Sequence, residues 1–373
     1  MILNKRLLSL DVMRGMTIAG MILVNNPGSW GHIYAPFRHA QWNGLTPTDL
    51  VFPFFMFIMG VAMYISMKKF DFRLNGSLLR KMLRRSATIF LIGVAIHALS
   101  KFLWGFHDGG LSEAFEALKN TRILGVLQRL AICSGVCSLI VVTCRHRLLP
   151  YIIGGLLVVY TLILMVGNGY VYGPENILSV VDRAVIGLPN MYNDRQIEPE
   201  GLLSTLPSIA HVLIGFCIGK IMLEVKDVKD KLNRLFVLGV QLTFSGWLLS
   251  YACPINKKVW SPTFVLVTCG LACLLLGLLS VCIDVKKSWK RTSTFEVFGV
   301  NPLFCYVLSQ VFAILAGYPF FGSTSLHQWL YNDVLCGVFG EGPLASLFYA
   351  LFTVGVVWLA GLYLYRKRIY IKI

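Results

Sequence analysis

The chain has 373 residues, of which 56% are hydrophobic and only 14% are charged. The mean hydropathy of +0.68 is higher than a soluble protein of this length needs for its core, which excludes a soluble globular domain and a disordered chain. The net charge of +16 would suit a nucleic-acid ligand, but the Lys and Arg residues are concentrated in every second loop between the apolar segments, which is typical of a membrane protein. The composition therefore predicts a polytopic membrane protein with no nucleic-acid partner.

Ten apolar windows are long enough to cross the roughly 30 Å hydrocarbon core of a bilayer. If the windows cross the membrane in turn, most of the 34 Lys and Arg residues lie in the loops on the same side of the membrane as the N-terminus. An excess of positive charge marks that side as cytoplasmic. We therefore predict an all-α fold of about ten transmembrane helices, with both termini cytoplasmic and residues 1–373 forming a single domain. The windows are 8–26, 48–67, 82–100, 122–143, 149–167, 203–222, 235–253, 261–283, 295–316 and 344–365.

The first window carries two charged residues and ends in a polar pair. Asp11 and Arg14 are three residues apart, so a helix places them on one face, where they can form an ion pair. Asn25 stands just before Pro27 and Gly28, which is a common way for a helix to stop. Asn25 is thus either a helix terminator or a polar group at the end of a span.

The loop from Phe37 to Asp49 concentrates polar groups between two apolar windows. The imidazole of His39 can donate and accept protons, and Trp42 with Asn43 can stack on and hydrogen-bond a sugar, so the loop is a candidate for chemistry at a membrane face. His39 could equally be a solvated loop residue. Asp49 has a structural alternative too, because Thr46-Pro47-Thr48-Asp49 has the spacing of a capping box; as a cap it would still fix where the loop enters the membrane.

Three further polar positions lie in or beside later windows. Arg129 is an embedded cation, which needs either a carboxylate or an anionic ligand such as a phosphate. Asn301 begins a buried helix and must find a hydrogen-bond partner, whereas Trp260 and Ser261 precede Pro262 in a pattern typical of helix capping. No metal-ligand spacing occurs, and Cys253 and Cys336 could form a disulfide, a pairing that the sequence leaves open.

Several ordered segments resemble the catalytic membrane domain of the heparan-α-glucosaminide N-acetyltransferase family. The longest run from Arg6 to Gly15, continue at Val24-Asn25, and then extend from His39 to Thr46 and from Asp49 to Pro53. Shorter similarities occur at 125–130, 199–201, 256–261, 299–301, 365–368 and 371–373, so the resemblance covers nearly the whole chain.

This resemblance implies transfer of an acetyl group from cytoplasmic acetyl-CoA to the amino group of a glucosamine on the opposite side of the membrane. It implies that His39 is the catalytic residue, as base or as acetyl carrier, supported by Asn25 and by Asp49. It places basic groups near the CoA phosphates at Arg6, Arg14, Arg129 and Lys372. The residues expected to bind the sugar are Trp42, Asn43, Glu200, Trp260 and Asn301.

Two other functions fit the same features. One is an O-acetyltransferase of an envelope polysaccharide, and the other is an amino-sugar transporter, which a polar outer mouth would also permit. No inverted repeat and no matched pair of interrupted helices is visible in the sequence. The partners expected are an amino-sugar or glycan, the lipid bilayer and, as an open question, a second copy in a homodimer; the predicted location is a bacterial inner membrane.

Overall fold

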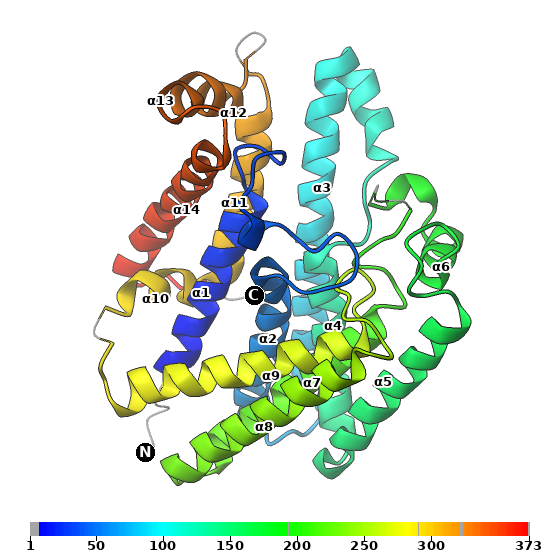
Figure 1. Ribbon diagram of the computed structural model, residues 1–373, viewed down its shortest axis with the longest axis vertical. Coiled ribbons are helices and arrows are strands. Elements are labelled where there is room, and N and C mark those ends of the chain that lie inside the picture. The colour runs from blue at the N-terminus through cyan, green and yellow to red at the C-terminus, as the bar shows by residue number, and fades with distance from the viewer. Residues whose placement is uncertain (1–6, 193, 195, 290, 321–323, 372–373) are drawn as a thin grey trace. The chain divides into compact units, whose positions relative to one another are not determined.

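The computed structural model in Figure 1 describes residues 7–192, 194, 196–289, 291–320 and 324–371. Within these residues the secondary structure is helical, with no β-strand, as the sequence predicts. Contacts between Cα atoms group the chain into two compact units. Unit 1 comprises Met1–His39, Thr46–Phe55 and Leu278–Lys372, and unit 2 comprises Ala40–Leu45 and Met56–Gly277.

The elements of unit 1 come from the two ends of the chain. They are α1 (Leu8–Asn25), η1 (Ala35–Phe37), η2 (Pro47–Leu50), η6 (Ser280–Val285), α10 (Ser293–Val300), α11 (Pro302–Gly317), α12 (Leu326–Gln328), η7 (Trp329–Leu335), α13 (Cys336–Phe339) and α14 (Pro343–Arg366). Two helices contribute residues to both units, namely α2 (Val51–Met67) and α9 (Pro262–Leu279).

The elements of unit 2 come from the middle of the chain. They are η3 (Lys68–Phe70), α3 (Gly76–Leu118), α4 (Val126–Thr143), η4 (His146–Leu148), α5 (Leu149–Val166), α6 (Ile177–Val185), η5 (Leu188–Asn190), α7 (Thr205–Glu224) and α8 (Val228–Leu249). Helix α4 packs against α3 and α7, and α7 also packs against α5 (Figure 1).

The predicted spans are confirmed for nine helices of the described part of the chain, which are long and apolar enough to cross a bilayer. The remaining window, at 295–316, is a helix pair rather than one helix, because α10 and α11 meet at Asn301 with a bend of 84°. Pro302 explains the break, since it lacks the N–H that a continuous helix requires. The sidedness of the termini and the single-domain organisation remain predictions.

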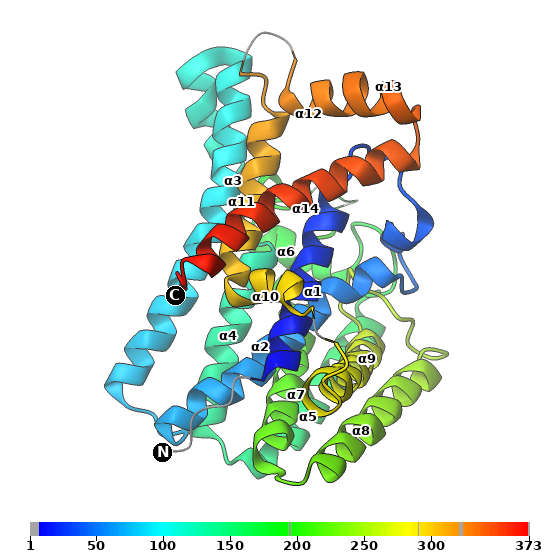
Figure 2. The ribbon, with the colours of Figure 1, turned by 90° about the vertical axis from the view of Figure 1, so that its left-hand side faces the viewer.

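In unit 1, α1 crosses α10 at very close range. A Cβ atom added to Gly15 would lie 1.8 Å from the carbonyl oxygen of Phe295, and one added to Gly299 would lie 2.1 Å from that of Asp11. Glycine is therefore required at both positions. Figure 2 shows α12 and α13 running across the end of α11, next to the start of α14. This crosswise segment contains the π-helical turn η7. Such turns are rare in proteins, and those that occur often lie at functional sites.

In unit 2, α3 is longer than the sequence predicts. We expect an outer loop from Lys101 to Thr121, but the helix continues to Leu118 and reverses direction at Gly109 and Gly110 (Figure 1). Gly110 has a φ of 75°, which favours glycine and explains the site of the turn. The loop prediction is wrong because helical propensity persists beyond the apolar window. The segments that the predicted windows leave between them at 168–201 and 317–343 likewise contain short helices.

Candidate functional site

The strongest polar constellation in unit 1 joins His39 to Asp49. The Nδ1 atom of His39 lies 2.7 Å from Oδ1 of Asp49, whose side chain is 1% exposed, whereas the imidazole is 39% exposed. Because a carboxylate can only accept hydrogen bonds, Nδ1 of His39 is the donor. The imidazole is therefore held in the tautomer that carries its lone pair on Nε2.

The second oxygen of Asp49 performs the capping role that the sequence predicts. Oδ2 accepts hydrogen bonds from the backbone N–H of Thr46 at 3.1 Å and from the Thr46 hydroxyl at 2.9 Å. The capping box at the start of η2 is thus confirmed. One buried carboxylate fixes the entry of the chain into α2 and also orients the His39 ring, so the capping and catalytic interpretations of Asp49 are compatible.

The segment that leads from α1 to His39 is tied to the start of α14. The hydroxyl of Ser346 donates to the carbonyl oxygen of Ser29 at 3.2 Å, and the backbone N–H groups of Gly28 and Ser29 donate to the carbonyl and hydroxyl oxygens of Ser346. A Cβ atom on Gly28 would lie 2.4 Å from the ring of Tyr331 in η7. The His39 loop is therefore held at both of its ends, by Asp49 and by Ser346.

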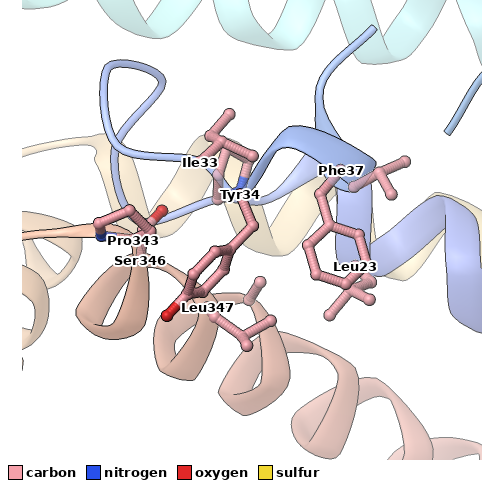
Figure 3. A pocket seen from close by; sticks show the side chains of 10 residues that line it. Leu23, Ile33, Tyr34, Phe37, Pro343, Ser346 and Leu347 are labelled. Carbon is pink, nitrogen blue, oxygen red and sulfur yellow. The ribbon is translucent and has the colours of Figure 1, made fainter. Parts of the chain in front are cut away.

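Tyr34 and Phe37 point from this loop toward Leu23 of α1 and Leu347 of α14, as Figure 3 shows. The pocket between them has a volume of about 20 Å³, which holds little more than one water molecule. Its walls are mainly apolar. It is thus a packing gap beneath the loop and is too small for a sugar.

Three other predicted residues of unit 1 have defined positions. Asn25 is the last residue of α1, as expected, and is partly exposed. The predicted ion pair is confirmed, because Nη1 of Arg14 lies 2.9 Å from Asp11 Oδ1, and the same nitrogen donates to the carbonyl of Gly299 at 3.2 Å. Arg14 is thus bound to protein groups in α1 and α10.

Asn301 stands at the break between α10 and α11 with its side chain turned toward the C-terminal segment. Its Nδ2 donates to the carbonyl of Ile369 and its Oδ1 accepts from the N–H of Ile371, both at 2.9 Å. The predicted need for a partner is therefore met by backbone. This arrangement gives Asn301 a structural role and leaves its predicted contact with a sugar without support.

The strongest constellation in unit 2 surrounds Arg129 of α4. The side chain is 1% exposed, its Nη2 donates to the Ser204 hydroxyl and, at 3.2 Å, to the Gly201 carbonyl, and its guanidinium lies 5.1 Å from the ring centre of Trp260. Within the described residues, Nε and Nη1 have no hydrogen-bond partner. A buried guanidinium with two such donors is suited to an anionic group.

The ring of Trp260 lies against Arg129, and the next residue, Ser261, caps helix α9. The Ser261 hydroxyl accepts from the N–H of Phe264 at 3.2 Å, which confirms the predicted N-cap of α9. Trp260 itself has a φ of 52° and is 1% exposed. The indole therefore packs over Arg129 and is not exposed to stack on a sugar in this state.

Glu200 belongs to an ion cluster that the sequence did not predict. Arg122 donates to both oxygens of buried Glu198 and to Oε2 of Glu200 at 2.6 Å, and its guanidinium stacks over Tyr192. Burial opposes the charge on Arg122, but the two carboxylates outweigh it and raise the Arg122 pKa. Burial also acts to raise the Glu200 pKa, yet Arg122 and Arg129 together lower it. Glu200 is therefore held ionised by two arginines.

Trp42 and Asn43 belong to unit 2 and contact other residues of that unit. The Trp42 ring stacks on Tyr172 with 4.6 Å between the ring centres, and its Nε1 donates to the Tyr170 carbonyl at 2.8 Å. The Asn43 Oδ1 accepts from Asn256 Nδ2 at 3.1 Å. One face of Trp42 and its only donor are thus used within the protein, which restricts a sugar to the opposite face.

Asp182 of α6 is a further residue that the sequence did not indicate. It is fully buried, its Oδ1 accepts from the Leu202 N–H at 2.8 Å, and its Oδ2 has no partner within the described residues. Burial raises its pKa to about 6, with Glu198 adding to the shift. No signal in the sequence marks Asp182, because its burial depends on the packing of Gly201 against it.

Two predicted cofactor residues, Arg6 and Lys372, lie outside the described residues. Within the described residues, no group of three or more metal-ligating side chains is found. All ten cysteines are free thiols, including Cys253 and Cys336, so the structure contains neither the disulfide between them nor any other.

Within the described residues, the fold and the constellations together define an all-helical, polytopic membrane protein with an exposed imidazole held by a buried carboxylate, and with a buried guanidinium. The family model described as heparan-alpha-glucosaminide N-acetyltransferase, catalytic, matches residues 6–251, about two thirds of the chain. The chain therefore belongs to this family, which confirms the resemblance found in the sequence.

Two mammalian relatives are similar over most of the chain. Heparan-alpha-glucosaminide N-acetyltransferase of Homo sapiens is 29% identical over 439 residues, covering 100% of this chain and 60% of the human protein. The Mus musculus protein of the same name is 29% identical over 370 residues, covering 82% of this chain and 53% of its own length. The chain thus spans a little over half the length of these relatives.

Proposed function

We propose that the protein is a transmembrane acetyltransferase that moves the acetyl group of acetyl-CoA to the amino group of glucosamine or a related amino sugar. Family membership and the names of the two relatives support this class of reaction. The observation that carries the proposal is the His39–Asp49 pair, in which a buried carboxylate orients an accessible imidazole.

Acyl transfer from a thioester to an amine requires a base for the proton of the amine. In the proposed reaction, Nε2 of His39 takes this proton as the new C–N bond forms and the C–S bond breaks, and CoA leaves as the thiol after protonation. Such base catalysis contributes on the order of 10² to 10⁴ in rate. Asn25 would donate to the developing oxyanion, a contact worth roughly 3 kcal/mol.

The diphosphate and 3′-phosphate of CoA require cationic donors. Arg129 has donors for this role, because two of them have no partner within the described residues and its side chain is buried. It lies in the first turn of α4, directly after the segment 101–121 that is predicted to be outside, so this role requires the bound CoA phosphates to reach the outer half of the membrane. Arg14 is a weaker candidate, since Asp11 and Gly299 already accept from it. Arg6 and Lys372 remain candidates on the resemblance alone.

The distribution of basic residues supports a cytoplasmic origin for acetyl-CoA and an outer position for His39. The pantetheine arm would then pass between helices to bring the thioester to the imidazole. A route in which His39 becomes acetylated first is the rival mechanism. Turnover of labelled acetyl-CoA without sugar separates them, because only the two-step route leaves label on His39.

The proposal is tested by acetylation of glucosamine by the purified protein with acetyl-CoA, comparing His39→Ala with His32→Ala. His32 is a matched control, because it lies in the same loop and is 41% exposed against 39% for His39. We expect His39→Ala to lose at least about 10²-fold in rate and His32→Ala to retain activity. Equal activities would refute a catalytic His39, and an acceptor panel of amino sugars and hydroxyl-bearing polysaccharides distinguishes N- from O-transfer.

Transport of an amino sugar is a second candidate because one span is interrupted. The 84° bend at Asn301 is a feature that transporters use to form binding sites within the bilayer. Uptake of labelled glucosamine into proteoliposomes without acetyl-CoA would support this function. Absence of uptake, together with acetylation that depends on His39, would exclude it.

A further inference from the structure

The segment between α2 and α3 carries the densest positive charge in unit 2. Lys68 and Lys69 lie on η3, Arg73 follows in the turn, and Arg80, Lys81 and Arg84 lie in the first turns of α3; all six side chains are exposed. Asp71 is the only acidic residue between positions 56 and 107. We call these six residues the basic surface.

The start of α3 is an unfavourable place for so many cations. A helix N-terminus carries a partial positive charge, so nearby cations are destabilising unless an anion offsets them. The N-cap of α3 is the neutral residue Asn75, which accepts from the Leu78 N–H at 2.8 Å, and the first turn contains no acidic residue. The charge of this surface is therefore not balanced within its own segment.

Helix α8 shows the balanced alternative in the same unit. Its first turns also carry three exposed or half-buried cations, Lys229, Lys231 and Arg234. There, however, Asp227 caps the helix by accepting from the Asp230 N–H, and Arg234 forms an ion pair with Asp230 at 3.0 Å. The two helix starts thus carry similar numbers of cations, but only the start of α8 has acidic residues that offset them.

The side of α3 on which the arginines lie indicates the kind of anion. Arg80 and Arg84 share a helix face with Leu91, which is 65% exposed, whereas Leu78, Met82 and Ile89 form the opposite, buried face. A leucine exposed to this degree within a membrane span is covered by lipid. The arginines thus lie at the lipid-facing side of the helix, at the end where headgroups begin.

Two exposed leucines beside the basic surface also indicate that it faces lipid. Leu74 is 45% exposed and Leu83 is 58% exposed. A soluble anion or an acidic protein segment would leave their apolar area in water, whereas a lipid provides both a phosphate and acyl chains. We propose that the basic surface binds the headgroups of anionic phospholipids, with Leu74 and Leu83 inserted beside them.

The test uses the full chain in nanodiscs of phosphatidylcholine with a minor fraction of phosphatidylglycerol. The lipids that stay bound after mild detergent extraction are quantified by mass spectrometry. One variant combines Arg80→Gln, Lys81→Gln and Arg84→Gln; the matched control combines Lys229→Gln, Lys231→Gln and Arg234→Gln, which removes the same charge. We expect retained phosphatidylglycerol to fall about tenfold in the α3 variant and to be unchanged in the α8 control.

An equal loss in both variants, or no loss in either, would overturn the proposal. If the α3 variant does not fold, Lys68→Gln combined with Lys69→Gln removes charge outside the helix, and a loss of phosphatidylglycerol of severalfold is expected. Release of phosphatidylglycerol by millimolar inorganic phosphate would also overturn it, because the surface would then be a site for soluble anions. None of these outcomes depends on acetyltransferase activity.

Discussion

The buried carboxylate Asp49 and the buried guanidinium Arg129 differ in how fully the protein satisfies them. Asp49 has hydrogen-bond partners on both oxygens, His39 on one and Thr46 on the other. Arg129 uses Nη2 for Ser204 and Gly201, while two of its nitrogens lack partners within the described residues. An unsatisfied buried donor costs roughly 1–3 kcal/mol, more if charged, so the second arrangement is the more costly one.

This difference separates a group that positions another residue from a group that is suited to a ligand. A saturated carboxylate cannot accept much more, and its effect on chemistry passes through the imidazole that it holds. A guanidinium with spare donors can form further hydrogen bonds when an anionic group binds to it. The two kinds of group should therefore respond differently to substitution.

Replacing Asp49 by Asn should reduce the acetylation rate by about 10² to 10⁴, because Nδ1–H of His39 loses its anionic acceptor and the ring loses its fixed tautomer. Steady-state kinetics measure the effect. Thr46→Val is the control: it removes the hydroxyl that contacts Asp49 Oδ2 but leaves the pair with His39, so stability should fall by about 1 kcal/mol with little change in rate. Equal rate losses in the two variants would contradict a positioning role.

Replacing Arg129 by Gln should raise the Michaelis constant for acetyl-CoA by about 10- to 100-fold, since a charge-assisted hydrogen bond is worth roughly 1.5–3 kcal/mol. The Michaelis constant for the sugar should not change. Arg234→Gln, on an exposed arginine paired with Asp230, serves as the control for lost charge. An unchanged Michaelis constant for acetyl-CoA in Arg129→Gln would remove this residue from the cofactor site.

Replacing Gly28 by Ala should lower the rate about tenfold, because the added methyl group would lie 2.4 Å from the Tyr331 ring and push the loop from its anchor on Ser346. Gly31→Ala, in the same loop, is the control, since its Cβ meets only the Ser29 hydroxyl, at 3.6 Å. Shortening Tyr331 to Leu should restore part of the activity of Gly28→Ala. No recovery would show that the two residues act independently.

Asp182→Asn should change how stability depends on pH. The Asp182 pKa is raised to about 6 in the folded protein, so its protonated form stabilises the fold at low pH and this stabilisation is lost as the pH rises through about 6. The Asn variant should therefore gain roughly 1–3 kcal/mol relative to wild type between pH 4 and pH 8. Melting temperatures in detergent measure this, and Asp230→Asn, on the exposed surface, should show no such gain.

Local sequence patterns were sufficient for features that depend on neighbours in the chain. The spans follow from apolar length, the Asp49 cap from the spacing of Thr46 and Asp49, and the Asp11–Arg14 pair from helical periodicity. The hydrogen bond by which Asp49 orients His39 is harder to predict from the sequence, because the two residues are ten positions apart and meet only when the loop folds back.

Features that depend on distant segments were not predictable in the same way. Arg122 binds Glu198 and Glu200, which lie 76 and 78 positions further along the chain. Asn301 likewise contacts backbone groups about 70 positions away. The helical hairpin of α3 was missed for a different reason, since helical propensity there continues without an apolar window. Such contacts become visible only when the packing of the helices is known.

The amide of Asn301 links the bent span to the end of the chain. Because both amide atoms hold the backbone around Ile369 and Ile371, a change in the angle between α10 and α11 would be transmitted to the final residues. Tyr370, which lies between the two tethered positions and is 46% exposed, is thus a suitable place for a spin label or fluorophore. A probe there would report straightening of the bend during turnover without any modification inside the bilayer.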